Sequence, residues 1–246
     1  MNETYPDDLA EVIREESAGN EVHRISMRDI PGRDMYCSDE AESRIREHLE
    51  QLPGAAYGIH FIDSGNYHYL SRIFTSFIKE KYDLVLIDHH TDMQETAFGK
   101  ILSCGSWASE VLEKDENLRS LTLCGPESAE GGRRFDMEAF GKKVPCMMFG
   151  EESADPGIPL YFSVDKDVLC EDECVTNWDQ GDLALSELGE LIKIFSAGRK
   201  VIGADICGGV SVSDPARSDE ALEKNTASDI YLYRLISGLM EADERN

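Results

Sequence analysis

Asp88-His89-His90-Thr91-Asp92 follows the apolar run Leu84-Val85-Leu86-Ile87, and together these segments decide the expected fold. Four consecutive aliphatic residues are typical of a strand in a parallel sheet that helices cover on both faces. Alternate side chains of an extended segment point to one side, so Asp88, His90 and Asp92 can converge where the strand ends. Ligands of open α/β sheets bind at the carboxyl ends of strands. A binding site is therefore predicted here.

Two other segments place ligand-type side chains at predicted strand ends. Ser163-Val164-Asp165-Lys166-Asp167 follows Pro159-Leu160-Tyr161-Phe162, and the same alternation puts Asp165 and Asp167 on one side. His68 lies at another strand-to-helix junction. Carboxylate and imidazole ligands suit hard or borderline divalent ions such as Mn²⁺, whereas structural zinc favours cysteine. The candidate metal ligands are His68, Asp88, His90, Asp92, Asp165 and Asp167.

Simpler interpretations of these segments remain open. Asp92 or Thr91 could cap the following helix. The Asp165-Lys166-Asp167 stretch could begin a calcium loop, although Leu169 stands at the third acidic position and the sixth position is not glycine. His89 alternates away from His90, so it is expected to pack or to orient a ligand.

These segments resemble those of the ureohydrolase family, which includes arginase, agmatinase and formiminoglutamase. The family's Gly-x-x-His, Asp-x-His-x-Asp and Ser-x-Asp-x-Asp elements are matched in family order by Gly65–His68, Asp88–Asp92 and Ser163–Asp167. The resemblance extends from about residue 55 to about residue 210. It implies an arginase-like α/β fold, in which a mainly parallel central sheet forms the middle of three α/β/α layers.

The resemblance also implies a cofactor, two Mn²⁺ ions per chain. One ion would be held by His68, Asp88, Asp92 and Asp165. The other would be held by Asp88, His90, Asp165 and Asp167, so that Asp88 and Asp165 bridge the pair. A hydroxide between the ions would be the nucleophile, because metal coordination lowers the pKa of bound water.

Three positions depart from the family pattern. Cys104 stands where arginase-like enzymes have a histidine assigned to proton shuttling. A glycine of the Gly208-Gly209 pair stands where guanidine-hydrolysing members have a glutamate, and Val168-Leu169-Cys170 replaces the usual aspartate-proline. We therefore expect a substrate other than arginine. Cys104, with a lowered pKa, and Asp92 are candidates for proton transfer, although Cys104 could equally be a small buried residue.

Trp178 and Asp179 follow the second acidic segment and align with a loop near the family's active site. An aromatic ring and an acid there could shape a pocket for a cationic or amide substrate. A plain anchor for the loop is the alternative.

Alternating apolar runs and helical patterns predict a parallel sheet with crossover helices. A chain of 246 residues with 41% apolar content can bury one α/β core, so a single domain over residues 1–246 is expected. Strands are predicted at His23–Met27, Ala56–Ile62, Leu84–Asp88, Ser120–Cys124, Val144–Phe149, Leu160–Ser163 and Lys200–Asp205. Helices are predicted at Ser38–Gln51, Tyr67–Glu80, Trp107–Glu113, Ala184–Ala197 and Ala227–Met240.

Composition limits the partners that are expected. The net charge of −25 argues against binding to nucleic acid or anionic lipid, and an acidic field favours cationic substrates. The seven cysteines are an odd number without C-x-x-C spacing, which indicates reduced thiols. The sequence has neither a signal-peptide pattern nor an apolar run of about 20 residues. We therefore expect a cytoplasmic protein that acts on a small nitrogenous substrate, and the family resemblance adds homo-oligomerisation as an open possibility.

The expected function is hydrolysis of a non-peptide carbon–nitrogen bond in a small linear amidine, guanidine or amide at a dinuclear manganese site. The alternative is a catalytically degenerate protein that binds a small nitrogenous ligand in a metal-dependent way, because the shuttle histidine and the guanidinium-binding glutamate are missing. A mononuclear zinc deacetylase of related fold fits less well, since the second set of ligands is complete.

Overall fold

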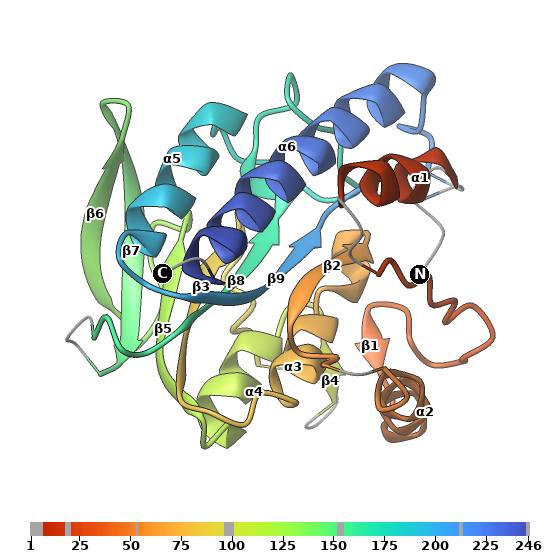
Figure 1. Ribbon diagram of the computed structural model, residues 1–246, viewed down its shortest axis with the longest axis horizontal. Coiled ribbons are helices and arrows are strands. Elements are labelled where there is room, and N and C mark those ends of the chain that lie inside the picture. Colours follow the sequence, from red (N-terminus) through yellow and green to blue (C-terminus); the bar gives the residue numbers. More distant parts are fainter. Residues whose placement is uncertain are drawn as a thin grey trace.

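The computed structural model describes residues 7–17, 21–52, 54–95, 101–151, 155–211 and 214–244. A seven-stranded sheet is formed by β2 (Gly58–Asp63), β3 (Tyr82–Ile87), β5 (Leu118–Cys124), β6 (Arg133–Ala139), β7 (Lys142–Gly150), β8 (Leu160–Asp165) and β9 (Val201–Cys207). In space the strands lie in the order β2-β9-β8-β3-β5-β7-β6 (Figure 1). The first five in this order run parallel, and β7 and β6 continue the sheet antiparallel. The mainly parallel sheet predicted from the sequence is confirmed.

Helices cover both faces of this sheet, as Figure 1 shows. The helices on one face are α2 (Asp39–Leu49), α3 (Leu70–Thr75) and α4 (Trp107–Lys114). The helices on the other face are α5 (Leu185–Ser196) and α6 (Asp219–Glu244), and α1 (Asp7–Glu16) packs beside α6. The predicted three-layer α/β/α architecture is therefore confirmed. Within the described part of the chain, no helix combines the length and apolar character needed to cross a membrane.

The central strand β3 explains why the layers form where they do. All six of its residues are buried, and alternate side chains enter different cores. Leu84 and Leu86 pack in the core under α3 and α4, whereas Val85 and Ile87 pack in the core under α5 and α6. Fully burying such a side chain contributes about 1.5–3 kcal/mol. A shift of one residue would exchange the two faces, so the strand register is strongly specified.

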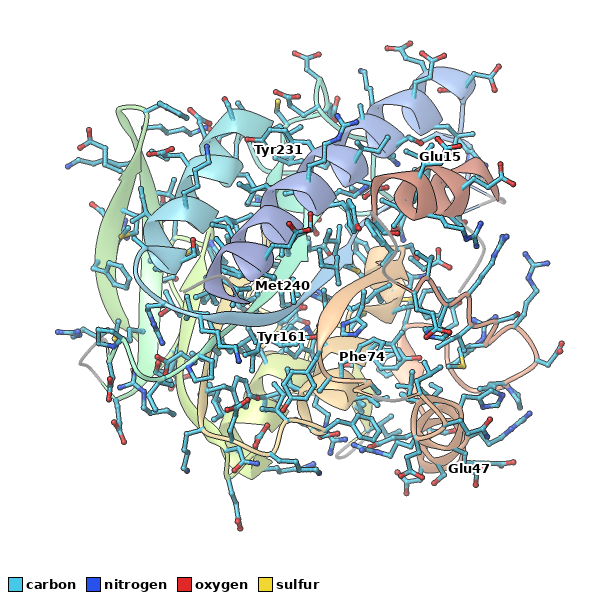
Figure 2. The ribbon with its side chains drawn as sticks, in the orientation of Figure 1. Glu15, Glu47, Phe74, Tyr161, Tyr231 and Met240 are labelled. Carbon is cyan, nitrogen blue, oxygen red and sulfur yellow. The ribbon has the colours of Figure 1, made fainter. Side chains whose placement is uncertain are left out.

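The segment that carries His68 is held on the sheet through α3. The ring of Phe74 on α3 stacks on His60 of β2 with ring centroids 3.9 Å apart. His60 Nδ1 lies 2.9 Å from Asp205 Oδ1 of β9, which also accepts a 2.7 Å hydrogen bond from the Tyr161 hydroxyl of β8. Figure 2 labels Phe74 and Tyr161 in the region between the sheet and this helix. Side chains from three strands thus fix the helix that follows His68.

The opposite layer depends on one close approach between helices. Tyr231 of α6 lies between α5 and α6 (Figure 2), where Gly189 of α5 faces its ring. A Cβ atom at position 189 would lie 2.2 Å from the Tyr231 hydroxyl oxygen. The glycine therefore permits this packing, although glycine inside a helix costs about 0.5–1 kcal/mol relative to alanine.

Several sequence predictions of individual elements were wrong. Residues His23–Met27 form no strand, and only Met27 of this segment is buried, so the apparent alternation has no apolar face. The edge strand β6 was not predicted, because its exposed and half-buried positions carry mostly polar side chains. The predicted helix Tyr67–Glu80 is shorter: a 3₁₀ turn, Gly65–Tyr67, precedes α3, which ends at Thr75. The C-terminal helix begins at Asp219 rather than Ala227.

Candidate metal centre

The candidate ligands gather at the carboxyl ends of neighbouring parallel strands. Asp88 directly follows β3, and Asp165 is the last residue of the adjacent strand β8. Asp167 lies in the short 3₁₀ helix Lys166–Val168, and His68 follows the 3₁₀ turn that comes after β2. The location predicted from the sequence is therefore the location that the structure shows.

His68 faces three of the carboxylates. Its Nδ1 atom lies 2.9 Å from Asp92 Oδ2, 3.2 Å from Asp88 Oδ2 and 3.4 Å from Asp165 Oδ2, and only 1% of the residue is exposed. The other ring nitrogen, Nε2, lies 2.9 Å from Ser163 Oγ. Because Ser163 engages Nε2, the imidazole presents Nδ1 to the carboxylates, as an orienting partner does for a metal-binding histidine.

His90 forms the second half of the cluster. Its Nδ1 atom lies 2.8 Å from Asp167 Oδ2 and 3.6 Å from Asp88 Oδ1. Asp88 therefore directs one oxygen toward His90 and the other toward His68, as a bridging carboxylate would. Asp167 Oδ1 also accepts a 3.0 Å hydrogen bond from the backbone N–H of His89.

All six predicted ligands are brought together in groups that could hold a metal ion. One group is His68, Asp88 and Asp92, and a second is Asp88, His90 and Asp167. A third group, His68, Asp165 and Cys207, includes a residue that the sequence did not suggest. Within each group the candidate ligand atoms lie within 4.8 Å of one another.

The backbone reaches this arrangement by a different route from the predicted one. The alternation of an extended strand does not continue past Ile87, and Asp92 adopts a left-handed conformation with φ of 50°. Its carboxylate accepts a 2.6 Å hydrogen bond from Trp107 Nε1, which helps to orient it. Asp165 Oδ1 accepts a 3.0 Å hydrogen bond from Asp167 N–H at the start of the 3₁₀ turn. Local turns, not strand pleating, make the acidic groups converge.

Two glycines lie against these acidic residues, one beside the Asp165 carboxylate and one beside the backbone carbonyl of Asp88. Gly208 has φ of +95°, and a Cβ atom there would lie 2.6 Å from Asp165 Oδ1. Gly125 has φ of +127°, and its Cβ would lie 2.0 Å from the Asp88 carbonyl oxygen. In this backbone, a glutamate at position 208 would collide with Asp165. The backbone at position 208 therefore leaves no space for a larger side chain beside Asp165.

Excess negative charge dominates the electrostatics of the cluster. Burial and, to a smaller extent, the neighbouring carboxylates of Asp167 and Asp88 together raise the pKa of Asp165 to about 8. Burial and Asp88 likewise raise the pKa of Asp167 to about 6. Hydrogen bonding to Asp167 and Asp88 raises the pKa of His90 to about 12. Such shifts indicate an environment that attracts positive charge.

The donor set fits a divalent cation. Asp88 Oδ2 is buried and accepts no hydrogen bond of normal geometry, a costly state for a carboxylate oxygen. Oxygen ligands with a minority of imidazoles suit Mn²⁺ and similar ions. The residues present would therefore satisfy a bound cation and would themselves be satisfied by it.

A pocket opens above the cluster. Its wall includes Tyr36, Gln94, Cys104 and Trp178, together with the candidate ligands. Tyr36 reaches it from β1 (Tyr36–Cys37), which pairs with β4 (Leu102–Ser103) in a small second sheet. None of the described residues that line the pocket is lysine or arginine.

The prediction that Cys104 has a lowered pKa was wrong. Helix α4 begins at Trp107, so Cys104 lies outside its first turn, and the residue is buried. Burial, with a further contribution from Asp92, raises the pKa of this thiol to about 12. Cys104 nevertheless lines the pocket, so it remains close to any bound substrate.

Trp178 and Asp179 lie beside the site as predicted, but each is tied to other residues. Trp178 lines the pocket and donates a 3.1 Å hydrogen bond from Nε1 to Asn66 Oδ1. Asp179 Oδ1 lies 3.1 Å from His90 Nε2, and Asp179 Oδ2 lies 3.5 Å from His89 Nε2. Asp179 therefore orients His90, a role that its position in the sequence did not reveal.

Comparisons with known proteins agree with this architecture. No family model matches the chain. Over 160 residues it is 30% identical to an uncharacterized protein of Thermotoga maritima, a match that covers 65% of this chain and 61% of the relative. The chain thus spans less than two thirds of that relative.

Solved structures show the fold more fully. The proclavaminate amidino hydrolase from Streptomyces clavuligerus has a TM-score of 0.57 at 14% identity, covering 82% of this chain and 72% of that one. A hypothetical agmatinase from Burkholderia thailandensis has a TM-score of 0.58 at 14% identity, covering 84% and 66%. A T. brucei arginase-like protein triple mutant bound with Mn²⁺ has a TM-score of 0.51 at 17% identity, covering 92% and 70%. The chain has the arginase-like fold, so the resemblance to ureohydrolases is confirmed at the level of the fold.

Proposed function

We propose that this protein is a divergent ureohydrolase that uses a dinuclear manganese centre to cleave a non-peptide carbon–nitrogen bond in a small linear amidine, guanidine or amide. The observation that carries the proposal is the convergence of six ligand-type side chains around Asp88, whose Oδ2 atom is buried without a hydrogen bond. In an arginase-like fold, such a cluster lies where the strands deliver ligands to a common edge.

Each residue of the centre has a task in this proposal. His68, Asp92, His90, Asp165 and Asp167 would hold the ions, and Asp88 lies between the two histidines, with one oxygen toward each. Ser163 and Asp179 keep the imidazoles oriented through the ring nitrogens that face away from the carboxylates. Bound divalent ions would supply a water of lowered pKa and would stabilise negative charge that develops on the substrate.

The pocket supports a neutral or cationic substrate. Aromatic side chains of Tyr36 and Trp178 form part of its wall, and no lysine or arginine among the described lining residues could pair with an anionic group. An aromatic face attracts a cation such as an amidinium or guanidinium. Because Gly208 replaces the glutamate, recognition of arginine itself is not proposed.

A test of this proposal is turnover by the manganese-loaded protein on a panel of linear amidines, guanidines and N-acyl amines. Ammonia or amine release should occur with at least one class and should fall at least about 10³-fold in Asp165→Ala, since the loss of a bridging ligand removes the metal-activated nucleophile. Glu127→Gln, a substitution of an exposed residue that lies between β5 and β6 and does not line the pocket, is the control and should retain turnover.

The candidates for the proton donor to the leaving nitrogen are Asp92, Cys104 and a water in the pocket, because both side chains line the pocket beside the ligands. If Asp92 transfers the proton, Asp92→Asn should lower kcat while Cys104→Ser leaves it near the wild-type value. The opposite pattern would assign the transfer to the thiol. A metal measurement on Asp92→Asn must accompany the assay, because Asp92 also faces His68.

A second function has specific support from two departures in the pocket. Gly208 offers no side chain to a guanidinium, and the Cys104 thiol has a raised pKa that makes it a weak proton donor. A metal-dependent binding protein for a small nitrogenous ligand would show both features. Saturable binding of an amidine to the manganese-loaded protein, without turnover on any member of the panel, would favour this second function.

A further inference from the structure

The third ligand-type group at the centre contains sulfur. Asp165 and Cys207 are direct partners in the parallel pairing of β8 with β9, so their side chains stand on the same face of the sheet. Ligand atoms of His68, Asp165 and Cys207 lie within 4.8 Å of one another. Cys207 is fully buried, and its thiol contacts the Ser64 carbonyl oxygen at 3.4 Å. A soft ligand thus adjoins a cluster of hard ones.

Neighbouring groups leave this part of the cluster open to an ion. Asp88 Oδ2, the buried oxygen without a hydrogen bond, lies 3.2 Å from the same His68 Nδ1 atom that faces Asp165. Gly208 and Gly65 approach the Asp165 carboxylate with no side chain of their own. A cation beside His68 could therefore contact carboxylate oxygens and the Cys207 sulfur together.

The two halves of the centre differ in chemistry as a result. The group on the far side of Asp88, formed with His90 and Asp167, offers nitrogen and oxygen only. The group beside His68 offers nitrogen, oxygen and sulfur. Thiolate ligands favour Zn²⁺ and other thiophilic ions, whereas carboxylate and imidazole suit Mn²⁺.

We propose that Cys207 is a ligand of the ion held by His68 and Asp165, and that this position selects a thiophilic divalent ion over Mn²⁺. The Asp88–His90–Asp167 position, which offers no sulfur, then discriminates less between such an ion and Mn²⁺. Binding of the ion displaces the thiol proton to solvent, so no other reactant is required. The inference rests on the proposed two-metal centre and adds a choice of metal to it.

Cobalt absorption tests the sulfur ligand directly. The metal-stripped protein is loaded with Co²⁺, and its content is measured alongside its near-ultraviolet spectrum. A sulfur-to-cobalt charge-transfer band should appear in the wild type, disappear in Cys207→Ser and persist in Cys104→Ser, which removes the other thiol that lines the pocket. Absence of the band in a cobalt-loaded wild type, or its loss in Cys104→Ser instead, would overturn the assignment of Cys207.

Competition between metals tests the selectivity. With Zn²⁺ and Mn²⁺ supplied together, the wild type should retain one Zn²⁺ ion, and Cys207→Ser should bind that ion on the order of 10–100-fold more weakly, the range seen when a supporting group of a metal site is lost. Equal zinc affinity in both proteins would overturn the inference. Cys207→Ala, with circular dichroism on each variant, separates loss of the ligand from loss of folding.

The two proposals fail differently. If the wild type binds two ions and hydrolyses a substrate but shows no sulfur band with cobalt, only the role of Cys207 is wrong. If no divalent ion binds to the wild type, both the metal centre and the sulfur ligand are overturned.

Discussion

Buried aspartates at the two ends of strand β3 have opposite electrostatic surroundings. At its start, Asp83 lies 2.9 Å from Arg119 Nε and 2.5 Å from Arg199 Nη2, and it also accepts a 2.6 Å hydrogen bond from Ser120 Oγ. Just past its end, Asp88 stands among three further aspartates with only two imidazoles for compensation. Arginine side chains of the protein itself therefore balance the carboxylate at the start of the strand, whereas the carboxylates at its end outnumber the described cationic partners and could hold a metal ion.

The pKa values follow the same division. Burial opposes ionisation of Asp83, but its two arginine partners outweigh that cost and hold its pKa below the usual value. Burial raises the pKa of Asp165 to about 8, and nearby carboxylates reinforce the effect. Both side chains are nearly inaccessible to solvent, so the different directions of their pKa shifts come from their partners and not from their burial.

The largest expected effect comes from removing the Asp83 carboxylate at the start of β3. Asp83→Asn should lower the free energy of unfolding by about 3–5 kcal/mol, because Asp83 is buried and the substitution leaves Arg119 and Arg199, whose side chains are 7% and 12% exposed, without its carboxylate. Urea denaturation measures the change. Glu151→Gln is the matched control, since Glu151 is exposed and reaches the same Arg119 only at 3.5 Å. A loss of less than about 1 kcal/mol in Asp83→Asn would show that the ion pairs are dispensable.

Binding of Mn²⁺ to the carboxylates at the end of β3 should stabilise the folded protein. Mn²⁺ at about 100 times its dissociation constant should raise the free energy of unfolding by about 2.7 kcal/mol, because the folded state binds the ion and the unfolded state does not. Asp83→Asn should show the same increment from its lower starting point. An increment equal to that given by Mg²⁺ at the same ionic strength would point to general screening instead.

Replacing an aspartate by asparagine should change the free energy of unfolding in opposite directions at the two ends of β3. In the metal-free protein at neutral pH, Asp165→Asn should raise the free energy of unfolding by about 1–2 kcal/mol, because the Asp165 carboxyl group, with its pKa raised to about 8, must take up a proton on folding and asparagine has no such cost. The variant should also lose the stabilisation by Mn²⁺. Thermal unfolding with and without a chelator gives both quantities, and destabilisation of the metal-free variant would contradict the contrast between the ends.

The smallest expected effect is the pH dependence of the stability that Asp83 contributes at the start of β3. Because the folded-state pKa of Asp83 is lowered, its contribution is complete above the ordinary aspartate pKa of about 3.9 and is lost as the pH falls through the lower folded value. The stability difference between wild type and Asp83→Asn should be constant from about pH 7 to about pH 5 and shrink below about pH 4. A stability difference that grows as the pH falls would contradict a lowered pKa of Asp83 in the folded state.

Sequence patterns were sufficient to predict the strands at this site and the six side chains that the structure brings together there. Leu84–Ile87 is apolar at every position, so its burial on both faces could be predicted, and the acidic and histidine residues beside it follow a short local pattern. What the sequence could not reveal depends on the pairing of distant strands. The proximity of Cys207 to Asp165 comes from the register of β8 with β9, and the contact of Asp179 with His90 joins residues 89 positions apart.

Predictions of strands were wrong where tertiary packing or strand pairing outweighed the local sequence pattern. The alternation in His23–Met27 has only one buried side chain and forms no strand. Strand β6 has a weaker pattern but pairs along its length with β7, so pairing outweighs propensity. Gly208 looked like a simple loss of the family's glutamate, and only the structure places it against the Asp165 carboxylate.

Metal content is the most direct test of the central claim that the end of β3 is a dinuclear metal site. Protein stripped with a chelator and reloaded with Mn²⁺ alone is analysed by plasma mass spectrometry, with Asp165→Ala alongside. We predict close to two manganese ions per wild-type chain and the loss of at least one in the variant. Wild-type protein that retains no manganese would contradict the account, because the carboxylates would then have to be balanced by protons alone.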